Sequence, residues 1–142
     1  MKEEIGRLLP HGASMCLLDS VETWDDTTIS CRTSTHRNQD NPLRFRGHLT
    51  ASAGLEYAAQ AMGVHVGLLD RDRRTENRIG LVGSVREVTF AIDRLDNLAD
   101  DLTVNARRMV EGDESYLYHF TVSHGACAII EGRASIFVKA AL

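Results

Sequence analysis

The sequence predicts an α+β fold in which one long central helix is wrapped by a curved antiparallel sheet of about six strands. Residues 51–69 form a single long segment with helical periodicity that is rich in alanine and glycine. Two segments with strand character precede this helix, and four more follow it over residues 78–139. One helix with six antiparallel strands fits an α+β architecture and not an alternating parallel array.

Two strands are predicted before the helix. Residues 15–23 are a compact apolar run that ends in polar residues. Residues 27–34 alternate between Ile29, Cys31 and Thr33 on one face and polar residues on the other. The Trp-Asp-Asp sequence at residues 24–26 predicts the turn between them. Residues 35–46 are polar, contain an Asn-Pro breaker and are predicted to form a loop.

The predicted helix carries apolar residues at helical spacing, namely Leu55, Ala58, Ala59, Met62, Val66 and Leu69. It also contains several glycines, each of which costs about 1 kcal/mol relative to alanine inside a helix. Close approach of another backbone is a physical reason to accept that cost. A helix lying inside a curved sheet needs such an approach.

Four strands are predicted after the helix, at residues 78–92, 102–110, 115–123 and 126–139. A charged loop at 70–77, a polar connector at 93–101 and hairpin turns at 111–114 and 124–125 separate them. Gly80, Gly83 and Gly132 are predicted to mark bulges or bends. A helix covered by the concave face of one sheet is the hot-dog architecture. Its exposed sheet edges predict a homodimer.

Length and composition narrow the class of protein. The 142 residues predict a single domain over residues 1–142. A formal net charge of -4 disfavours a nucleic-acid partner, and no apolar run is long enough to span a membrane or to act as a signal core.

Cys16, Cys31 and Cys127 lie in apolar strand-like runs, which predicts buried, reduced thiols in a cytoplasmic protein. With no Cys/His cluster, phosphate loop or dinucleotide fingerprint, neither a metal nor a cofactor is predicted.

His48 and Glu56 are the candidate catalytic residues. A histidine titrates near neutral pH, and a glutamate on a buried helix face has a perturbed pKa, so the two can act as an acid-base pair. Backbone N–H groups at the helix start, near Ala53 and Gly54, are candidate donors to a carbonyl oxygen. The alternative is that His48 is an ordinary loop histidine and that Glu56 is a helix N-terminal carboxylate favoured by the helix dipole, without a catalytic role.

Other polar residues support or compete with this pair. Gln60 lies one helical turn after Glu56 and either orients the carboxylate or satisfies the backbone of a nearby strand end. His65 lies near the end of the helix, where a structural role is expected. His11 lies in a Pro-His-Gly turn, and we expect it to bond the backbone there.

Arg44 and Arg46 immediately precede the Gly-His pair. In an acidic protein a basic pair can steer an anionic partner toward the site. The alternative is that Arg44 and Arg46 are simply solvated charges of a surface loop.

Two motifs resemble a known family. Residues 9–21 read Leu-Pro-His-Gly-Ala-Ser-Met-Cys-Leu-Leu-Asp-Ser-Val, and residues 56–62 read Glu-Tyr-Ala-Ala-Gln-Ala-Met. Both are similar to motifs of the hot-dog 3-hydroxyacyl-(acyl carrier protein) dehydratases, in particular the divergent branch associated with aryl polyene biosynthesis. The segment from His48 to Glu56 is six residues shorter than the common family motif and lacks its prolines, so Glu56 and Gln60 match the family pattern more closely than His48.

The resemblance implies a dehydration without a cofactor. His48 would remove the α-proton of a 3-hydroxyacyl thioester, and Glu56 of the other subunit would protonate the departing hydroxyl. The helix N–H groups would hold the thioester oxygen. An acidic acyl carrier protein would deliver the substrate to a rim carrying Arg44 and Arg46.

Two further functions are compatible with the same residues. A hot-dog thioesterase can use a helix carboxylate without a histidine, so Glu56 alone would serve. A non-catalytic subunit could bind the carrier protein and pair with an active paralogue. A homodimer, a heterodimer with a paralogue and a higher oligomer are all compatible with the sequence.

Overall fold

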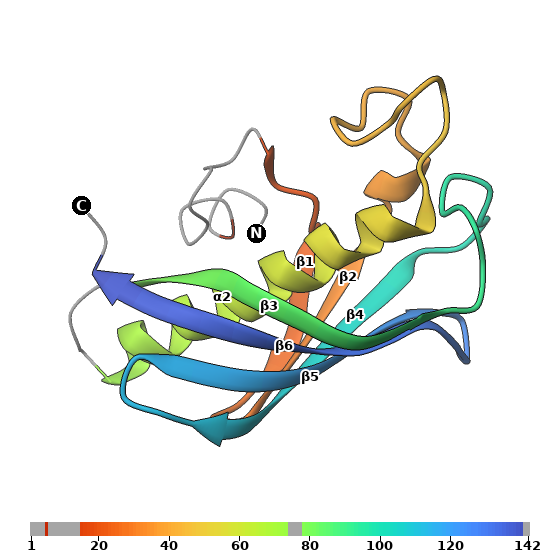
Figure 1. Cartoon of the computed structure of the whole chain (residues 1–142). Coiled ribbons are helices and arrows are strands. Elements are labelled where there is room, and N and C mark those ends of the chain that lie inside the picture. Colours follow the sequence, from red (N-terminus) through yellow and green to blue (C-terminus); the bar gives the residue numbers. More distant parts are fainter. Residues whose placement is uncertain (1–4, 6–14, 74–77, 141–142) are drawn as a thin grey trace.

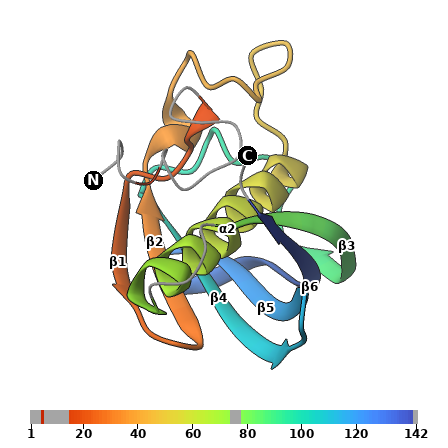
Figure 2. The same ribbon diagram turned by 90° about the vertical axis from the view of Figure 1, so that its left-hand side faces the viewer.

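The computed structural model describes residue 5, residues 15–73 and residues 78–140. Its six strands form one antiparallel sheet in the order β1-β2-β4-β5-β6-β3. The strands are β1 (Ser20–Trp24), β2 (Thr28–Thr33), β3 (Arg78–Phe90), β4 (Leu102–Glu111), β5 (Ser115–His124) and β6 (Cys127–Ala140). The sheet curves around the long helix α2 (Gly54–Arg73), which lies across its concave face (Figures 1 and 2). The predicted α+β hot-dog fold is confirmed.

The core lies between α2 and the concave face. On β5, Tyr116, Tyr118, Phe120 and Val122 are buried, while the residues between them are partly exposed. This period of two is what a strand with one covered face requires. The same alternation over β2 buries the predicted residues Ile29, Cys31 and Thr33. Side chains on the other face of the sheet are therefore available for contacts outside the core.

The first predicted strand is too long. Strand β1 begins at Ser20, and residues 16–18 are buried without pairing to a strand. The backbone of Leu17 is instead bonded to side chains: its N–H donates to Gln60, and its carbonyl accepts from Thr33 and Thr35. The apolar run therefore predicted the burial of residues 16–18 correctly. The backbone of Leu17, however, is bonded to polar side chains and not to the backbone of a neighbouring strand. Residues 6–14, which include His11 and the start of the first motif, lie outside the described residues.

The helix begins and ends later than predicted. Residues 51–53 form the 3-10 helix η3 (Ala51–Ala53), and α2 continues past residue 69 to Arg73. Asp70, predicted to lie in a loop, is buried and receives hydrogen bonds from the Arg78 guanidinium at 2.6 and 3.1 Å. This ion pair ties the last turns of the helix to the start of β3.

The glycines allow close packing between the helix and the sheet. A Cβ placed on Gly80 of β3 would lie 3.7 Å from the Cα of Gly63 on α2, so the two backbones approach closely as predicted. Gly83 lies at a register shift of β3, which confirms the predicted bulge, and the Phe137 ring covers it. Gly80 pairs regularly with Val138, so no bulge lies at that position. Gly132 lies at a register shift between β6 and β3, because its neighbours Arg133 and Glu131 pair with Arg86 and Thr89, and this agrees with the predicted bulge or bend. Gly132 also leaves room for Phe120, since an added Cβ would meet that ring at 2.9 Å.

The cysteine prediction holds for two of the three residues. Cys16 and Cys31 are buried, and burial raises the pKa of the Cys31 thiol to about 12. Cys127 is exposed, contrary to the prediction, because it starts β6 directly after the turn at Gly125 and Ala126. Among the described helices, none combines the length and apolar character that crossing a membrane requires.

Candidate active site

Glu56 and Gln60 lie one turn apart near the start of α2. The Gln60 Nε2 group is 3.4 Å from Glu56 Oε1 and donates at 2.8 Å to the carbonyl of Met15. The Gln60 Oε1 atom accepts the N–H of Leu17 at 2.8 Å. Gln60 is buried, whereas Glu56 is partly exposed.

The Gln60 amide has one orientation that satisfies all of these partners. The Leu17 N–H requires the amide oxygen, so Nε2 must face Met15 and Glu56. Both roles considered for Gln60 are therefore present in one side chain: it bonds the backbone that leads into β1, and it offers a donor to the Glu56 carboxylate.

Glu56 lies at the start of α2, which directly follows the 3-10 helix η3. Glu56 is the acidic residue in the first turn, where the helix dipole is positive. The N–H groups of the two predicted donors are engaged in the turn before the helix, because Ala53 donates to Thr50 and Gly54 to Ala51 and Ser52. Gly54 is also closely packed, since a Cβ there would lie 2.2 Å from Ile130 Cδ1. Ala53 and Gly54 thus shape the end of the helix that carries Glu56.

His48 lies at the end of a tight hairpin. Phe45 and His48 exchange backbone hydrogen bonds of 2.8 and 3.0 Å, and Arg46 and Gly47 between them have φ values of 53° and 78°. Two consecutive positive φ angles are typical of a two-residue hairpin turn with glycine at its second position. The next residue, Leu49, is fully buried and donates its N–H to Asp96 at 2.9 Å, which anchors the hairpin.

The His48 side chain is exposed, and it makes no hydrogen bond or ion pair with any residue that the structure describes. In particular, no such contact joins His48 to Glu56 within one chain. The two candidate catalytic residues therefore come from separate elements: His48 from a rigid hairpin that faces solvent, and Glu56 from the start of the buried helix.

The two arginines of the hairpin differ in their surroundings. The Arg44 guanidinium donates to the carbonyls of Asn38 and Gly47 at 2.7 and 2.9 Å, and only a tenth of its side chain is exposed. Arg44 thus holds the loop together. The Arg46 guanidinium lies 5.2 Å from the centre of the exposed Phe45 ring, so these two side chains form the tip of the hairpin.

A buried polar network next to Glu56 was not predicted. The hydroxyl of Tyr57 lies 2.8 Å from Thr35 Oγ1 and 2.9 Å from Asn41 Nδ2. Burial raises the pKa of the Tyr57 hydroxyl, which stays neutral. Thr35 also donates to the Leu17 carbonyl, so this network and Gln60 hold the same segment of chain from two sides. A tyrosine on the inward face of the predicted helix, with a polar loop nearby, was the available signal.

Asp96 is a second residue that was not predicted. It accepts from the Leu49 N–H and from the Arg94 guanidinium, whose hydrogen bond holds the Asp96 pKa far below its usual range. Among the residues that the structure describes, no three His, Cys, Asp or Glu side chains lie close enough together to hold a metal ion.

A long helix in the concave face of one six-stranded antiparallel sheet, with a carboxylate in its first turn, defines this chain as a hot-dog protein. Within that class the chain belongs to the ApeP-like family: the family model, described as ApeP dehydratase, matches residues 3–142. A search of curated protein sequences finds no match.

Solved structures share the fold. The dehydratase heterocomplex ApeI:P from Xenorhabdus doucetiae superposes with a TM-score of 0.84 at 22% sequence identity, covering 94% of this chain and 89% of that chain. A thioesterase from Haemophilus influenzae gives a TM-score of 0.70 at 10% identity, with coverages of 99% and 91%. A thioesterase mutant from Staphylococcus aureus gives 0.62 at 13% identity, with coverages of 84% and 92%. At these identities the similarity shows the fold.

Proposed function

We propose that this protein dehydrates a 3-hydroxyacyl thioester carried by an acyl carrier protein to the trans-2-enoyl thioester. The observation that carries the proposal is the Glu56 carboxylate in the first turn of α2, within 3.4 Å of a Gln60 amide that is itself fixed by two backbone groups. The family assignment to the ApeP-like dehydratases supports the same reaction.

The proposed reaction divides the proton transfers between two side chains. His48 accepts the α-proton, and the electron pair of that C–H bond forms the new double bond. The bond from the β-carbon to the hydroxyl breaks, and Glu56, in its protonated form, supplies the proton with which the hydroxyl leaves as water. The N–H groups of Ala53 and Gly54, the predicted donors to the thioester oxygen, are bonded within the turn before α2, so the proposed reaction assigns them no contact with the substrate.

The exposure of His48 to solvent supports a site built from two subunits. His48 faces solvent from an anchored hairpin, so a neighbouring subunit can approach it. The edge strand β3 carries Val82 and Val85 with 43% and 39% of their surfaces exposed, on an edge that a partner subunit can cover. The partner is a second copy or a paralogue, and the ApeI:P heterocomplex supports the second option.

The carrier protein would meet the tip of the hairpin. Arg46 is the exposed cation there, since the Arg44 guanidinium is largely enclosed by the loop. An acidic carrier would be steered toward this charge. We further propose that the chain acts in the cytoplasm as a single domain over residues 1–142.

A product assay tests the proposal. The protein is incubated with 3-hydroxyacyl and with simple acyl carrier-protein thioesters, following enoyl absorbance and free thiol separately. Enoyl product from the first substrate, lost in His48→Ala, is the expected result. Assays of the chain alone and with a co-purified paralogue distinguish a homomeric enzyme from a subunit of a heterocomplex.

A thioesterase is the second candidate. The observation that favours it is that Glu56 and Gln60 form a complete pair within one chain, without His48. Thiol release that survives His48→Ala, with no enoyl product, would support it over a dehydratase. Neither product, with retained carrier binding, would identify a non-catalytic subunit.

A further inference from the structure

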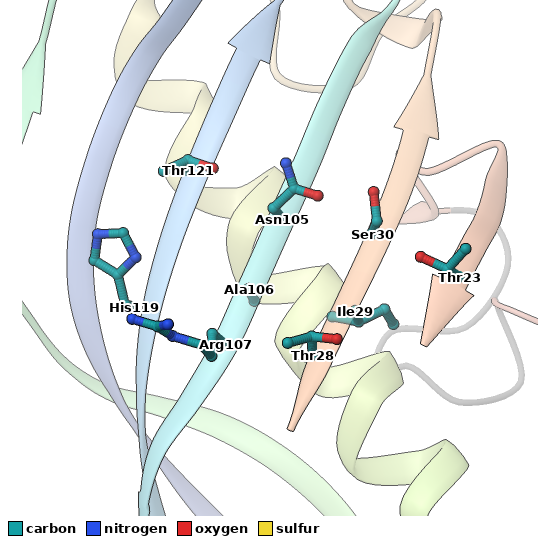
Figure 3. Close-up of a pocket in the computed structure, with 9 residues that line it drawn as sticks. All are labelled: Thr23, Thr28, Ile29, Ser30, Asn105, Ala106, Arg107, His119 and Thr121. Carbon is teal, nitrogen blue, oxygen red and sulfur yellow. The ribbon is translucent and has the colours of Figure 1, made fainter. Parts of the chain in front are cut away.

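A polar pocket lies on the face of the sheet opposite α2, away from Glu56 and Gln60. Its volume is about 360 Å³, and it is lined by Thr23, Thr28, Ile29, Ser30, Asn105, Ala106, Arg107, His119 and Thr121 (Figure 3). Ile29 and Ala106 are buried toward the helix, so the other seven side chains, all of them polar, form the wall that faces solvent. The proposed dehydration uses none of these residues.

The strand register groups the lining residues into two rows. In the first row, Thr28 of β2 pairs with Arg107 of β4, and Arg107 pairs with His119 of β5. In the second row, Ser30 pairs with Asn105, which pairs with Thr121. Figure 3 shows Arg107 and His119 together at one end of the pocket, with the second row at the other end.

The first row continues beyond the pocket as a basic row. His119 pairs with Arg133 of β6, and Arg133 pairs with Arg86 of β3. Two carboxylates partly neutralise it: Glu87 lies 3.4 Å from Arg133, and Glu131 lies 3.3 Å from His119 Nε2. Like-charged side chains on adjacent strands destabilise a sheet. In a protein with a net charge of -4, this row is a local concentration of positive charge.

Arg107 has no carboxylate at ion-pair distance among the residues that the structure describes, whereas Arg32 on the same face is paired with Glu22 at 3.5 Å. Arg107 is exposed and lies in the same pocket as the hydroxyl and amide groups of Ser30, Thr121 and Asn105, which can donate hydrogen bonds. The Thr28 hydroxyl already donates to Asp25 Oδ1 at 2.9 Å. A guanidinium without an ion pair at one end of a pocket and neutral donors at its other end can hold an anion between them.

We propose that this pocket binds a phosphate group, either inorganic phosphate or a phosphate monoester of a small molecule. A guanidinium fork matches two phosphate oxygens, and the donors on β2, β4 and β5 approach from different sides, which suits a tetrahedral oxyanion better than a planar carboxylate. The volume is at the lower end of the range for small-molecule sites and exceeds what one phosphate fills, which leaves room for an ester group.

Chemical-shift titrations of the ¹⁵N-labelled protein test this site. Inorganic phosphate, glycerol 3-phosphate and acetate are the three probes, each at constant ionic strength. Saturable shifts of the amides of Ser30, Asn105, Arg107 and Thr121 are expected with at least one phosphate probe, and weaker or no binding with acetate. Tighter binding of glycerol 3-phosphate identifies an ester site, and tighter binding of inorganic phosphate identifies a phosphate site.

Substitutions separate a specific site from general electrostatic attraction. Arg107→Gln is expected to weaken binding by about tenfold or more, because one charge-assisted interaction is lost. Arg32→Gln removes the same charge from the same face, outside the pocket, and is expected to change binding less than about twofold. Equal weakening by both substitutions, shifts that never saturate, or acetate binding as tightly as phosphate would each overturn the proposal. Thermal melts of both variants check that they are folded.

Discussion

At the scale of single residues, Gln60 connects the candidate catalytic carboxylate to the rest of the fold. Its amide bonds the Met15 carbonyl and the Leu17 N–H, both at 2.8 Å, and it also reaches Glu56. The spacing of Glu56 and Gln60 could be read from the sequence. The partners at residues 15 and 17 could not, because they are backbone groups brought together by the fold and not by sequence proximity.

Replacing Gln60 by leucine should lower the free energy of unfolding by about 2–4 kcal/mol. The substitution keeps the approximate volume but leaves the buried Leu17 N–H and the partly buried Met15 carbonyl without their partner, at about 1–3 kcal/mol for a fully buried group. Urea denaturation measures the loss. Gln39→Leu, at an exposed position, is the control and should stay within about 0.5 kcal/mol of the wild type. A Gln60→Leu protein as stable as this control would show that the amide is dispensable.

His65 is a buried histidine whose structural role was predicted from its place on the helix. Its Nδ1 atom lies 2.6 Å from the Tyr118 hydroxyl, and its Nε2 atom lies 2.7 Å from the Asp25 carbonyl. The carbonyl can only accept, so Nε2 carries the proton of the neutral ring and Nδ1 accepts from Tyr118. Burial, reinforced by the nearby Arg108 charge, lowers the pKa of His65, and the hydrogen bond to Asp25 opposes this shift.

Stability should therefore fall as the pH is lowered through the range in which unfolded histidine titrates, near pH 6.5. The unfolded state binds a proton there that the folded state does not, so the loss is at most about 1.4 kcal/mol per pH unit for His65. The buried His36, whose pKa burial also lowers, adds to the same slope. Urea denaturation at pH 7.5 and 5.5 measures the slope, which should be smaller in His65→Gln. An unchanged slope in that variant would contradict the assignment of a buried neutral His65.

At the scale of elements, the long helix and the later strands could be predicted because their periodicity extends over many residues. The start of the first strand could not, because residues 16–18 are buried without pairing to a strand, and side chains bond the backbone of Leu17 instead. The end of α2 was missed for a similar reason: Arg78, eight residues away, provides the partner that allows Asp70 to be buried. In both places a distant polar partner overrides the local pattern.

The close contact of Gly54 with β6 provides a test of how α2 fits the sheet. A Cβ at Gly54 would lie 2.2 Å from Ile130 Cδ1, so Gly54→Ala should destabilise the protein by about 1–3 kcal/mol despite the better helix propensity of alanine. Ile130→Val removes that carbon atom. In the Ile130→Val background, Gly54→Ala should be neutral or stabilising, and a double-mutant cycle from urea denaturation measures the coupling. Additive effects would indicate that the two residues do not constrain each other.

At the scale of the whole molecule, the arrangement of His48 and Glu56 predicts a shared active site. If the enzyme is a homodimer, equal mixing of His48→Ala and Glu56→Gln subunits makes half of the dimers mixed, and each mixed dimer holds one intact site of two. Dehydration should then recover to about a quarter of the wild-type rate after refolding the two inactive variants together. No recovery, with mixed dimers demonstrated by mass spectrometry, would rule out a site shared between two copies of this chain.

The central claim is that the Glu56 carboxylate carries out the dehydration. The most direct measurement is the rate of enoyl thioester formation by Glu56→Gln, which keeps the size and hydrogen-bonding groups of the side chain but cannot transfer a proton. We expect a loss of about 100-fold or more, the usual contribution of general acid catalysis, while Glu114→Gln in the β4–β5 turn stays at the wild-type rate. A Glu56→Gln enzyme that retains the wild-type rate would contradict the account.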